Sequence, residues 1–418
     1  MPGCENRKSR NSSIRDGGQL SDAARAAEMA ARASYGRLLA LLSARTSDIA
    51  KAEDALADAF AKALDHWPTN GVPGNPDAWL LTVARNRLTD VQRRRTRFPT
   101  EHELPDMPEE ESSDPEFPDQ RLALMMVCAH PAIAADLHTP LMLQTVLGLD
   151  AKHIARLYLM SPAALSKRLV RAKTKIRDAG IPFKVPDQDV LPERSNSVLE
   201  AIYGLHAHDW LDPAETLGEE ALYLSDLLCK LLPDNAEALG LSALIAFSHA
   251  RVNARLVAGV LVPTDEQDTK LWNDELISYG KRHLSRAYRL KAVDRFQIEA
   301  AIEAVHIERK QSGETDWKAL NKLYHAYLTK VPTAGGLVAQ AAITGRLHGA
   351  EAGLAAIEAI EESVGPAFQP FWAVKADLEA RAGRNNEALA CYEKAISLAT
   401  DLPTIEFLKQ RRITVLPN

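Results

Sequence analysis

Apolar residues recur at helical spacing along most of this chain, in stretches separated by short runs rich in glycine and proline. The stretches between these breaks are filled mainly by Ala, Leu, Glu, Lys and Arg, which favour helices. No segment shows sustained two-residue alternation of β-branched side chains, which is the mark of a half-buried strand. The pattern therefore predicts an all-α protein.

The stretch from Ser161 to Arg177 has an apolar stripe and a basic surface. Ser161 suits the N-cap of a helix and Pro162 suits its first position. The apolar stripe consists of Leu165, Leu169, Ala172 and Ile176. The basic side chains are Lys167, Arg168, Arg171, Lys173, Lys175 and Arg177. With the helical segment 151–159 before it, the stretch predicts a helix-turn-helix, while an amphipathic helix with a solvated basic face remains open.

Two further helices are predicted nearer the N-terminus, over residues 48–66 and 78–97, with a turn-rich loop over 67–77 between them. The second helix has an apolar side at its start and a dense run of arginines at its end. We expect the apolar end to be anchored and the arginine-rich end to reach nucleic-acid phosphate, although a solvated helix end is an alternative.

The segment from Phe98 to Gln120 contains five prolines and nine acidic residues, and no Lys or Arg. It has too little apolar surface to offset the entropy of ordering, so we expect a flexible linker. The predicted organisation is a disordered N-terminus at 1–20, helical domains at 21–98 and 121–184 joined by the linker 99–120, and a helical C-terminal domain at 185–418.

Charge is distributed unevenly over the 418 residues, whose formal net charge is −6. The segments 1–98 and 121–184 are each net basic, whereas the linker and the region after residue 184 are acidic. Because neutralising phosphates supplies most sequence-independent affinity for nucleic acid, two basic modules on a tether favour contact with nucleic acid at two places.

Several other classes of function find no support in the sequence. The four cysteines are scattered, without C-x-x-C pairs or histidines at ligand spacing, so we expect no disulfide framework and no metal site. We find no phosphate-binding glycine loop and no hydrolase motif, and therefore expect no cofactor and no enzyme activity. No apolar run is long enough for a membrane span, so we expect a cytoplasmic protein without membrane contact.

Three stretches together resemble a known family. They are AEDALADAFAKAL, AWLLTVARNRLTDVQRRR and, beyond the acidic linker, IARLYLMSPAALSKRLVRAKTKIR. Their order and spacing resemble regions 2 and 4 of an extracytoplasmic-function sigma factor of bacterial RNA polymerase. The distal half is similar to the subgroup that carries a fused, tetratricopeptide-like C-terminal extension. The resemblance implies two small sigma domains, the second with a helix-turn-helix, that bind core RNA polymerase and promoter DNA.

The resemblance also implies roles for particular residues. The resemblance implies that docking on the clamp helices of the polymerase's largest subunit involves Asp54, Asp58, Phe60 and Lys62. Phe60 could instead belong to the core. Capture of a flipped base and binding of the −10 element fall to Asn70, Asn75, Asn86, Arg87, Arg93 and Arg94. Reading of the −35 element falls to Ser161, Ala163, Ser166, Lys167 and Arg171, with Arg168 and Lys173 on phosphates.

The C-terminal half shows a weak internal repeat. Ala341, Gly353, Leu354 and Ile357 precede Ala376, Ala388, Leu389 and Tyr392 by thirty-five residues, close to the period of a tetratricopeptide repeat. Stacked helical pairs of this kind present a concave surface, for which we expect a peptide or protein partner. A purely structural helical array is the alternative.

Together these features predict a sigma factor that opens the −10 element, binds the −35 element and is regulated in cis by its C-terminal domain. One rival is a stand-alone helix-turn-helix regulator whose C-terminal half senses a peptide or small ligand. A second rival is a tetratricopeptide scaffold whose basic regions meet only acidic proteins.

Overall fold

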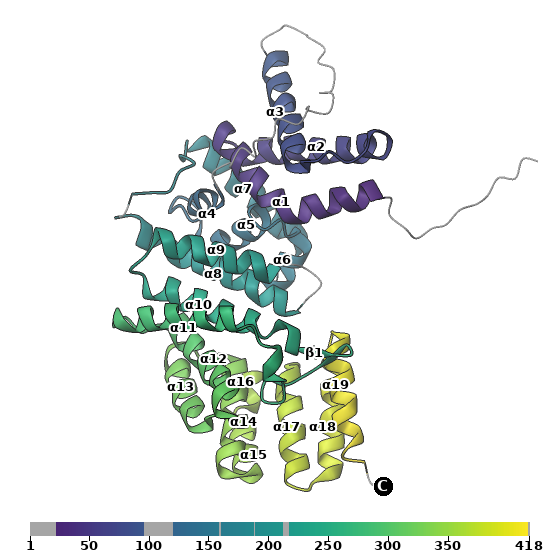
Figure 1. Ribbon diagram of the computed structural model, residues 1–418, viewed down its shortest axis with the longest axis vertical. Coiled ribbons are helices and arrows are strands. Elements are labelled where there is room, and N and C mark those ends of the chain that lie inside the picture. Colours follow the sequence, from purple (N-terminus) through teal and green to yellow (C-terminus); the bar gives the residue numbers. More distant parts are fainter. Residues whose placement is uncertain (1–21, 96–119, 159, 188, 212–216, 417–418) are drawn as a thin grey trace, which may run out of the picture. The chain divides into compact units, whose positions relative to one another are not determined.

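The computed structural model describes residues 22–95, 120–158, 160–187, 189–211 and 217–416 (Figure 1). This part of the chain is almost wholly helical, which confirms the predicted all-α class. The predicted disordered N-terminus and all of the predicted linker except Gln120 lie outside the described residues. The chain forms two compact units, Met1–Ser197 and Val198–Asn418, which we call unit 1 and unit 2.

Unit 1 contains two groups of helices. The first group consists of α1 (Asp22–Thr46), α2 (Ile49–Asn70) and α3 (Pro76–Arg95). The second consists of α4 (Arg121–Cys128), the short 3-10 helix η1 (Ala135–Leu137), α5 (His138–Thr145), α6 (Ala151–Leu157) and α7 (Pro162–Asp178). The next helix, α8 (Leu191–Leu211), begins in unit 1 and continues into unit 2.

Helices α1, α2 and α3 enclose an apolar core to which leucines, alanines and two tryptophans contribute. The Asp48 side chain starts α2 by accepting a hydrogen bond from the Lys51 amide at 3.2 Å. The helix runs to Asn70, so the residues from Trp67 to Asn70, predicted as loop, are helical. Trp67 is 1% exposed and packs edge-on against Trp79, with ring centroids 5.5 Å apart, and this tertiary contact overrides the local turn signals.

The predicted recognition helix is present as α7, and its first turn has the expected cap. The Ser161 hydroxyl accepts a hydrogen bond from the Ala164 amide at 3.2 Å, and Pro162 occupies the first turn. The four residues predicted to form its apolar stripe are all buried: Leu165, Leu169, Ala172 and Ile176. Helix α6 packs directly against α7, while the helix-turn-helix assignment itself stays a prediction.

The compact unit 1 extends into α8, to Ser197, which lies beyond the predicted domain boundary at residue 184. The Arg194 guanidinium donates a hydrogen bond to the carbonyl of Met126 at 3.1 Å. The His138 ring nitrogen Nδ1 lies 3.0 Å from the Ser197 hydroxyl. The first turns of α8 therefore complete the packing of unit 1, which a sequence boundary drawn at a proline-rich stretch could not reveal.

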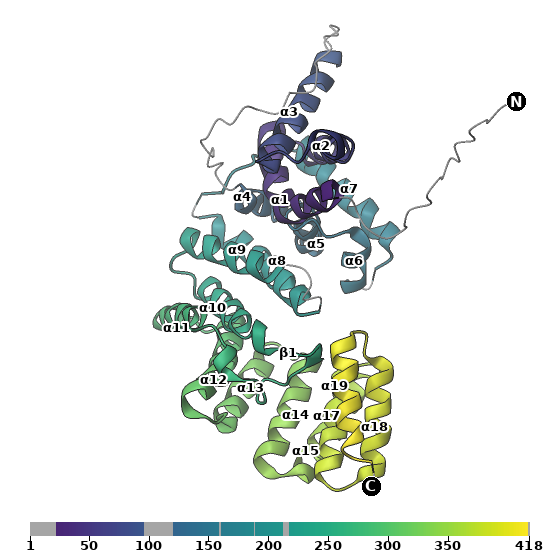
Figure 2. The ribbon, with the colours of Figure 1, turned by 45° about the vertical axis from the view of Figure 1, so that its right-hand side comes forward.

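Unit 2 is a succession of packed helices with one small hairpin. Its helices are α9 (Leu217–Leu231), α10 (Ala236–Ala250), α11 (Asp274–Arg289), α12 (Arg295–Ser312), α13 (Trp317–Lys330), α14 (Ala334–His348), α15 (Ala350–Glu358), α16 (Glu361–Val364), α17 (Gln369–Arg381), α18 (Asn385–Leu398) and α19 (Leu402–Ile413). The 3-10 helices η2 (Val252–Ala254) and η3 (Thr269–Leu271) flank the hairpin. Helices α14, α15, α17, α18 and α19 stand side by side (Figure 2).

The hairpin pairs β1 (Leu256–Val257) with β2 (Val260–Leu261) in antiparallel register. Its two turn residues, Ala258 and Gly259, have φ angles of 51° and 79°. Positive φ at both positions matches the twist of a tight hairpin turn. The hairpin was not predicted, because strands of two residues leave no detectable alternation in the sequence.

The repeat positions found in the sequence fall in two helical hairpins, α14 with α15 and α17 with α18. Gly345 and Gly353 let α14 and α15 approach closely, since a Cβ on Gly353 would lie 2.8 Å from the Cα of Gly345. The Leu378 side chain of α17 fills the space beside both glycines. The small residues thus serve helix packing as expected, and the tetratricopeptide assignment stays a prediction.

Candidate polymerase and DNA interface

The residues predicted to dock on polymerase lie along α2 in different environments. Asp54 and Lys62 are exposed. Phe60 is half-buried and packs against the core of the first helical group, so at least part of its role is structural. The carboxylate of Asp58 accepts a hydrogen bond from Nε of Arg87 at 2.5 Å. Two residues predicted to bind different partners, polymerase and DNA, are therefore bound to each other.

The loop predicted to capture a flipped base is reduced to the short turn from Gly71 to Asn75. The Asn70 amide nitrogen lies 2.6 Å from Nε2 of His66, one helical turn earlier. The Asn75 side-chain oxygen accepts a hydrogen bond from the Ala78 amide at 3.0 Å and so caps α3. The cap uses one lone pair of that oxygen, and the Asn75 amide nitrogen is the donor that this side chain would offer to a base.

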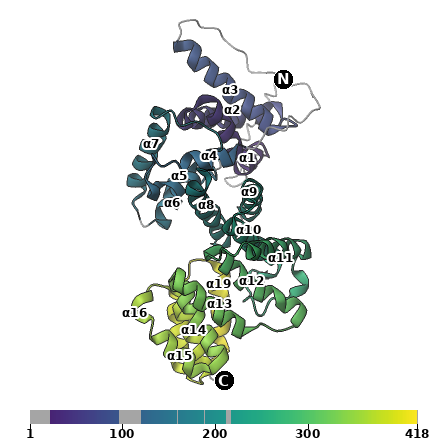
Figure 3. The ribbon, with the colours of Figure 1, turned by 90° about the vertical axis from the view of Figure 1, so that its left-hand side faces the viewer.

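Helix α3 carries the residues predicted to hold the −10 backbone. Its C-terminal half projects beyond α1 and α2 (Figure 3). Asn86 is half-buried, and Arg87 is held by Asp58. The side chains of Arg93 and Arg94 lie outside the described residues, so their predicted contacts with phosphate are untested.

The outer face of α7 presents most of the residues predicted to read the −35 element. Ser161, Ala163, Lys167 and Arg171 are exposed, and Ser166 is half-buried. Sequence reasoning missed Val170, an apolar side chain that is 61% exposed between Lys167 and Arg171. Its position away from the apolar stripe was the available signal, since an apolar residue on a basic face has no core to enter.

Two cations predicted to contact phosphate are engaged within unit 1. Arg168 donates to the Asp136 carboxylate of η1. Lys173 is only 7% exposed, and its Nζ donates to both carboxylate oxygens of Glu53 on α2, at 2.5 and 2.7 Å. Contact between Lys173 and DNA would first require its buried ion pair to open, whereas Arg168 is partly exposed and keeps further N–H donors beside its bond to Asp136.

The Glu53–Lys173 pair joins the two helical groups of unit 1. Burial raises the pKa of Glu53, and the Lys173 charge opposes that rise without cancelling it. Burial and the Glu53 charge both raise the pKa of Tyr35 nearby. The two groups also meet at Gly36 on α1, where a Cβ would lie 1.8 Å from the carbonyl oxygen of Val146.

Replacing Glu53 by Gln should loosen this contact, because it leaves the buried Lys173 ammonium without a countercharge. Breaking a buried pair in this way costs about 3 kcal/mol. Hydrogen exchange of α2 and α7 in the full-length protein measures the effect, and Glu53→Gln should accelerate it.

The double variant Glu53→Gln with Lys173→Met is the matched control, because it removes the buried charge as well. Its exchange should return close to that of the unchanged protein, since replacing both members of a buried pair is nearly neutral. If Glu53→Gln alone exchanged no faster, the pair would not stabilise the contact between α2 and α7.

Within the described ranges, no helix combines the length and apolar character needed to cross a membrane. The same residues contain no group of three or more His, Cys, Asp and Glu placed to hold a metal ion.

Comparison with known proteins identifies two segments and one relative. The sigma-70 region 2 family matches residues 31–98, which include most of α1 and all of α2 and α3. A family of unknown function, DUF6596, matches residues 194–288. An uncharacterised protein of Rhizobium meliloti (strain 1021) is 34% identical over 376 residues, covering 86% of this chain and 89% of that protein. No solved structure matches the chain.

The region 2 match covers the bundle that carries the polymerase and −10 candidates. It supports a role in transcription initiation with RNA polymerase as partner. The second match covers α8 after its first turn, together with α9, α10 and most of α11. The chain belongs to the same family as the Rhizobium meliloti protein, and it combines a sigma-70 region 2 with a DUF6596 helical extension.

Proposed function

We propose that this chain is a sigma factor of the extracytoplasmic-function type. It binds the clamp helices of core RNA polymerase through α2 and directs the enzyme to promoters. The observation that carries the proposal is the sigma-70 region 2 match, which falls on a well-packed bundle of α1, α2 and α3. The exposed charges of Asp54 and Lys62 suit a polar docking surface, and the projecting end of α3 suits contact with the opened −10 element.

Helix α7 reads the −35 element in this proposal. Its exposed face places Ala163, Lys167, Val170 and Arg171 within one arc of the helix, at spacings of three and four residues. Lysine and arginine can donate to guanine, and an exposed valine can contact a thymine methyl group. Val170 thereby joins the residues proposed to set promoter preference.

The C-terminal region regulates these modules in cis and receives a peptide or protein partner. Regulation in cis is supported by the chain's course through α8. This helix begins in unit 1, whose packing it completes, and continues into unit 2. A truncation at Lys184 would remove Arg194 and Ser197 from their contacts in unit 1 and would confound any test.

Purified full-length protein mixed with bacterial core RNA polymerase and a pool of genomic promoter fragments tests the proposal. We expect a stable complex and new transcription start sites that core enzyme alone does not produce. The double variant Asp54→Ala with Lys62→Ala should bind core at least tenfold more weakly, as two polar contacts are lost at about 1 kcal/mol each. Duplex binding without any core binding would instead indicate a stand-alone DNA-binding regulator.

Regulation in cis is tested by placing a protease site between α8 and α9, which leaves α8 intact on unit 1 after cleavage. We expect cleavage to change the yield of promoter-specific transcripts severalfold. Equal yields before and after cleavage, with the two fragments separated, would contradict a regulatory role.

A further inference from the structure

An acidic turn lies in the loop that follows β2 and contacts helices far away in the sequence. The amides of Glu266 and Gln267 both donate to the carbonyl of Pro263, at 2.9 and 3.1 Å, and close a single helical turn. We call Pro263–Gln267 the acidic turn, because it presents the adjacent carboxylates of Asp265 and Glu266.

Arginines from three helices of unit 2 bind the acidic turn. Arg346 of α14 donates to the Asp265 carboxylate at 3.2 Å, and Arg411 of α19 donates to the Glu266 carboxylate. Arg309 of α12 donates to the carbonyls of Thr264 and Gln267, at 2.9 and 2.6 Å. Three guanidinium groups thus bind two side-chain acids and two main-chain carbonyls, with Arg309 donating to both carbonyls.

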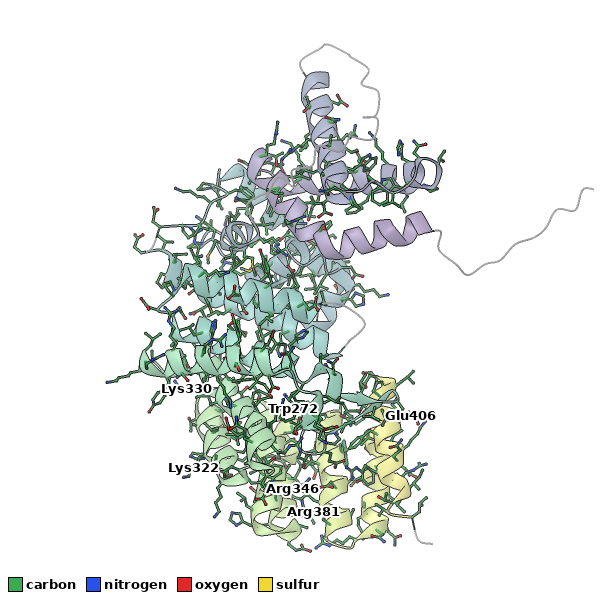
Figure 4. The ribbon with its side chains drawn as sticks, viewed as in Figure 1. Trp272, Lys322, Lys330, Arg346, Arg381 and Glu406 are labelled. Carbon is green, nitrogen blue, oxygen red and sulfur yellow. The ribbon has the colours of Figure 1, made fainter. Side chains whose placement is uncertain are left out.

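These arginines are held by aromatic rings as well as by the acids. The guanidinium of Arg346 lies 5.4 Å from the centre of the Trp317 ring, and that of Arg411 lies 5.2 Å from the Phe407 ring. Figure 4 labels Arg346 within the C-terminal helices. A guanidinium stacked on a ring keeps its N–H edges available for carboxylates, so these two sites are pre-positioned without the acidic turn.

Open space flanks the acidic turn on two sides. One cavity of about 290 Å³ is lined by Trp317, Arg346, Tyr392 and Arg411. A second, of about 470 Å³, is lined by the hairpin and by Gln410 and Arg411. Both cavities are also bordered by Glu266 and Phe407. Two cavities that share lining residues at the acidic turn fit the flanking residues of a peptide better than a single small anion.

The acidic side chains are held weakly, whereas the residues beside them are buried. Asp265 is half-buried at 24% exposure and Glu266 is exposed at 47%, and their arginine partners are 40% and 36% exposed. Solvent therefore screens both ion pairs and reduces them toward the value of about 0 to 1 kcal/mol that exposed pairs contribute. In contrast, Gln267 and Trp272 are buried, and buried Arg251 donates to the Thr264 hydroxyl at 2.9 Å. The two carboxylates can therefore leave their arginines while the loop on either side stays in place.

We propose that the cleft formed by the loop after β2 with α14, α17 and α19 is a docking site for a peptide segment with two consecutive acidic residues. Such a segment belongs to a partner protein, and Asp265 and Glu266 occupy the arginines until it displaces them. This names the chemistry of the partner proposed above for the C-terminal region. Its test contains no polymerase or DNA, so it can fail or succeed independently of the sigma-factor proposal.

Fluorescence anisotropy with a labelled peptide of sequence LVPTDEQD, a copy of residues 261–268, tests the site on the full-length protein. The unchanged protein should bind weakly, because its own turn competes at an effective concentration of about 1 mM. The variant Asp265→Asn with Glu266→Gln keeps the arginines and should bind at least tenfold more tightly. Adding Arg346→Gln and Arg411→Gln should abolish that gain.

Glu358→Gln with Glu362→Gln is the matched control, since both residues are exposed and the same charge is removed elsewhere in unit 2. It should bind the peptide no better than the unchanged protein. The proposal is overturned if the turn variant gains no more than this control, or if the neutral peptide LVPTNQQN binds equally well.

Hydrogen exchange gives a second test that needs no substitution. Saturating the unchanged protein with the acidic peptide should accelerate exchange at Asp265 and Glu266 and leave the buried Gln267, α10 and α12 unaffected. Unchanged exchange at the acidic turn under saturation would show that the peptide does not displace it, and would overturn the proposal even if the variants unfolded.

Discussion

Replacing Lys167 and Arg171 together by alanine is expected to weaken binding to a −35 element duplex by about 30-fold or more. Each lost contact with a base edge or phosphate costs about 1 to 3 kcal/mol, and a loss of 2 kcal/mol corresponds to about 30-fold in affinity. Both side chains are exposed on the outer face of α7, away from the buried stripe, so the fold should be preserved. Anisotropy titrations with promoter fragments selected in the polymerase assay measure the loss.

The control for this prediction replaces Lys318 and Lys322 of α13 by alanine (Figure 4 labels Lys322). Both side chains are exposed, and the double substitution removes the same positive charge as the α7 variant. Their loss should change promoter affinity by less than twofold. Since phosphate contacts release counterions, the α7 variant should also show a shallower dependence of affinity on salt. An equal loss in both variants would mean that net charge, and not the face of α7, determines binding.

Replacing Gly240 by alanine is expected to destabilise unit 2 by about 2 to 3 kcal/mol. A Cβ at this position of α10 would lie 2.6 Å from the backbone nitrogen of Gln297 and 2.9 Å from its Cα. Because the obstructing atoms are backbone, the first turn of α12 must move, and overpacking of this kind outweighs the gain of about 1 kcal/mol from helix propensity. The glycine also lets the Glu237 carboxylate reach the Phe296 and Gln297 amides, at 2.8 and 3.2 Å.

Gly335→Ala in α14 is the matched control, since nothing lies within 4 Å of the Cβ that it would add. It should leave stability unchanged or raise it by up to about 1 kcal/mol, through helix propensity alone. In thermal unfolding followed by circular dichroism, Gly240→Ala should lower the transition of unit 2 by roughly 5 to 10 °C, with no decrease for Gly335→Ala. Similar melting of both variants would show that α10 and α12 do not pack as closely as described.

Local patterns were sufficient to predict the helical class and the faces of individual helices. The stripe of α7 was read from spacing and is buried at every predicted position, because burial on one side of a helix leaves a period of three to four residues. The same reasoning predicted that α2 ends at residue 66, whereas this helix continues to Asn70. Trp67 and Pro68 look like loop residues locally, yet the contact of Trp67 with Trp79 keeps the last turn of α2 helical.

The exposure of the candidate site residues was predictable only in part, and their roles stay predictions. Lys167 and Arg171 are where the sequence placed them, on the outer face of α7. Lys173 was grouped with them because it has the same charge, but it lies buried against Glu53, 120 residues earlier. Arg87 and Asp58 were assigned to separate partners and instead form an ion pair.

By itself, the sequence determined the all-α class, the capped helix α7 and the net charge of each segment, because these depend on residues close together in the chain. Only the tertiary structure decided which charges are engaged, where unit 1 ends within α8, and how Arg346 and Arg411 bind the acidic turn. These features join residues 29 to 145 positions apart. No local period encodes such pairings, since they form only when packing brings distant helices together.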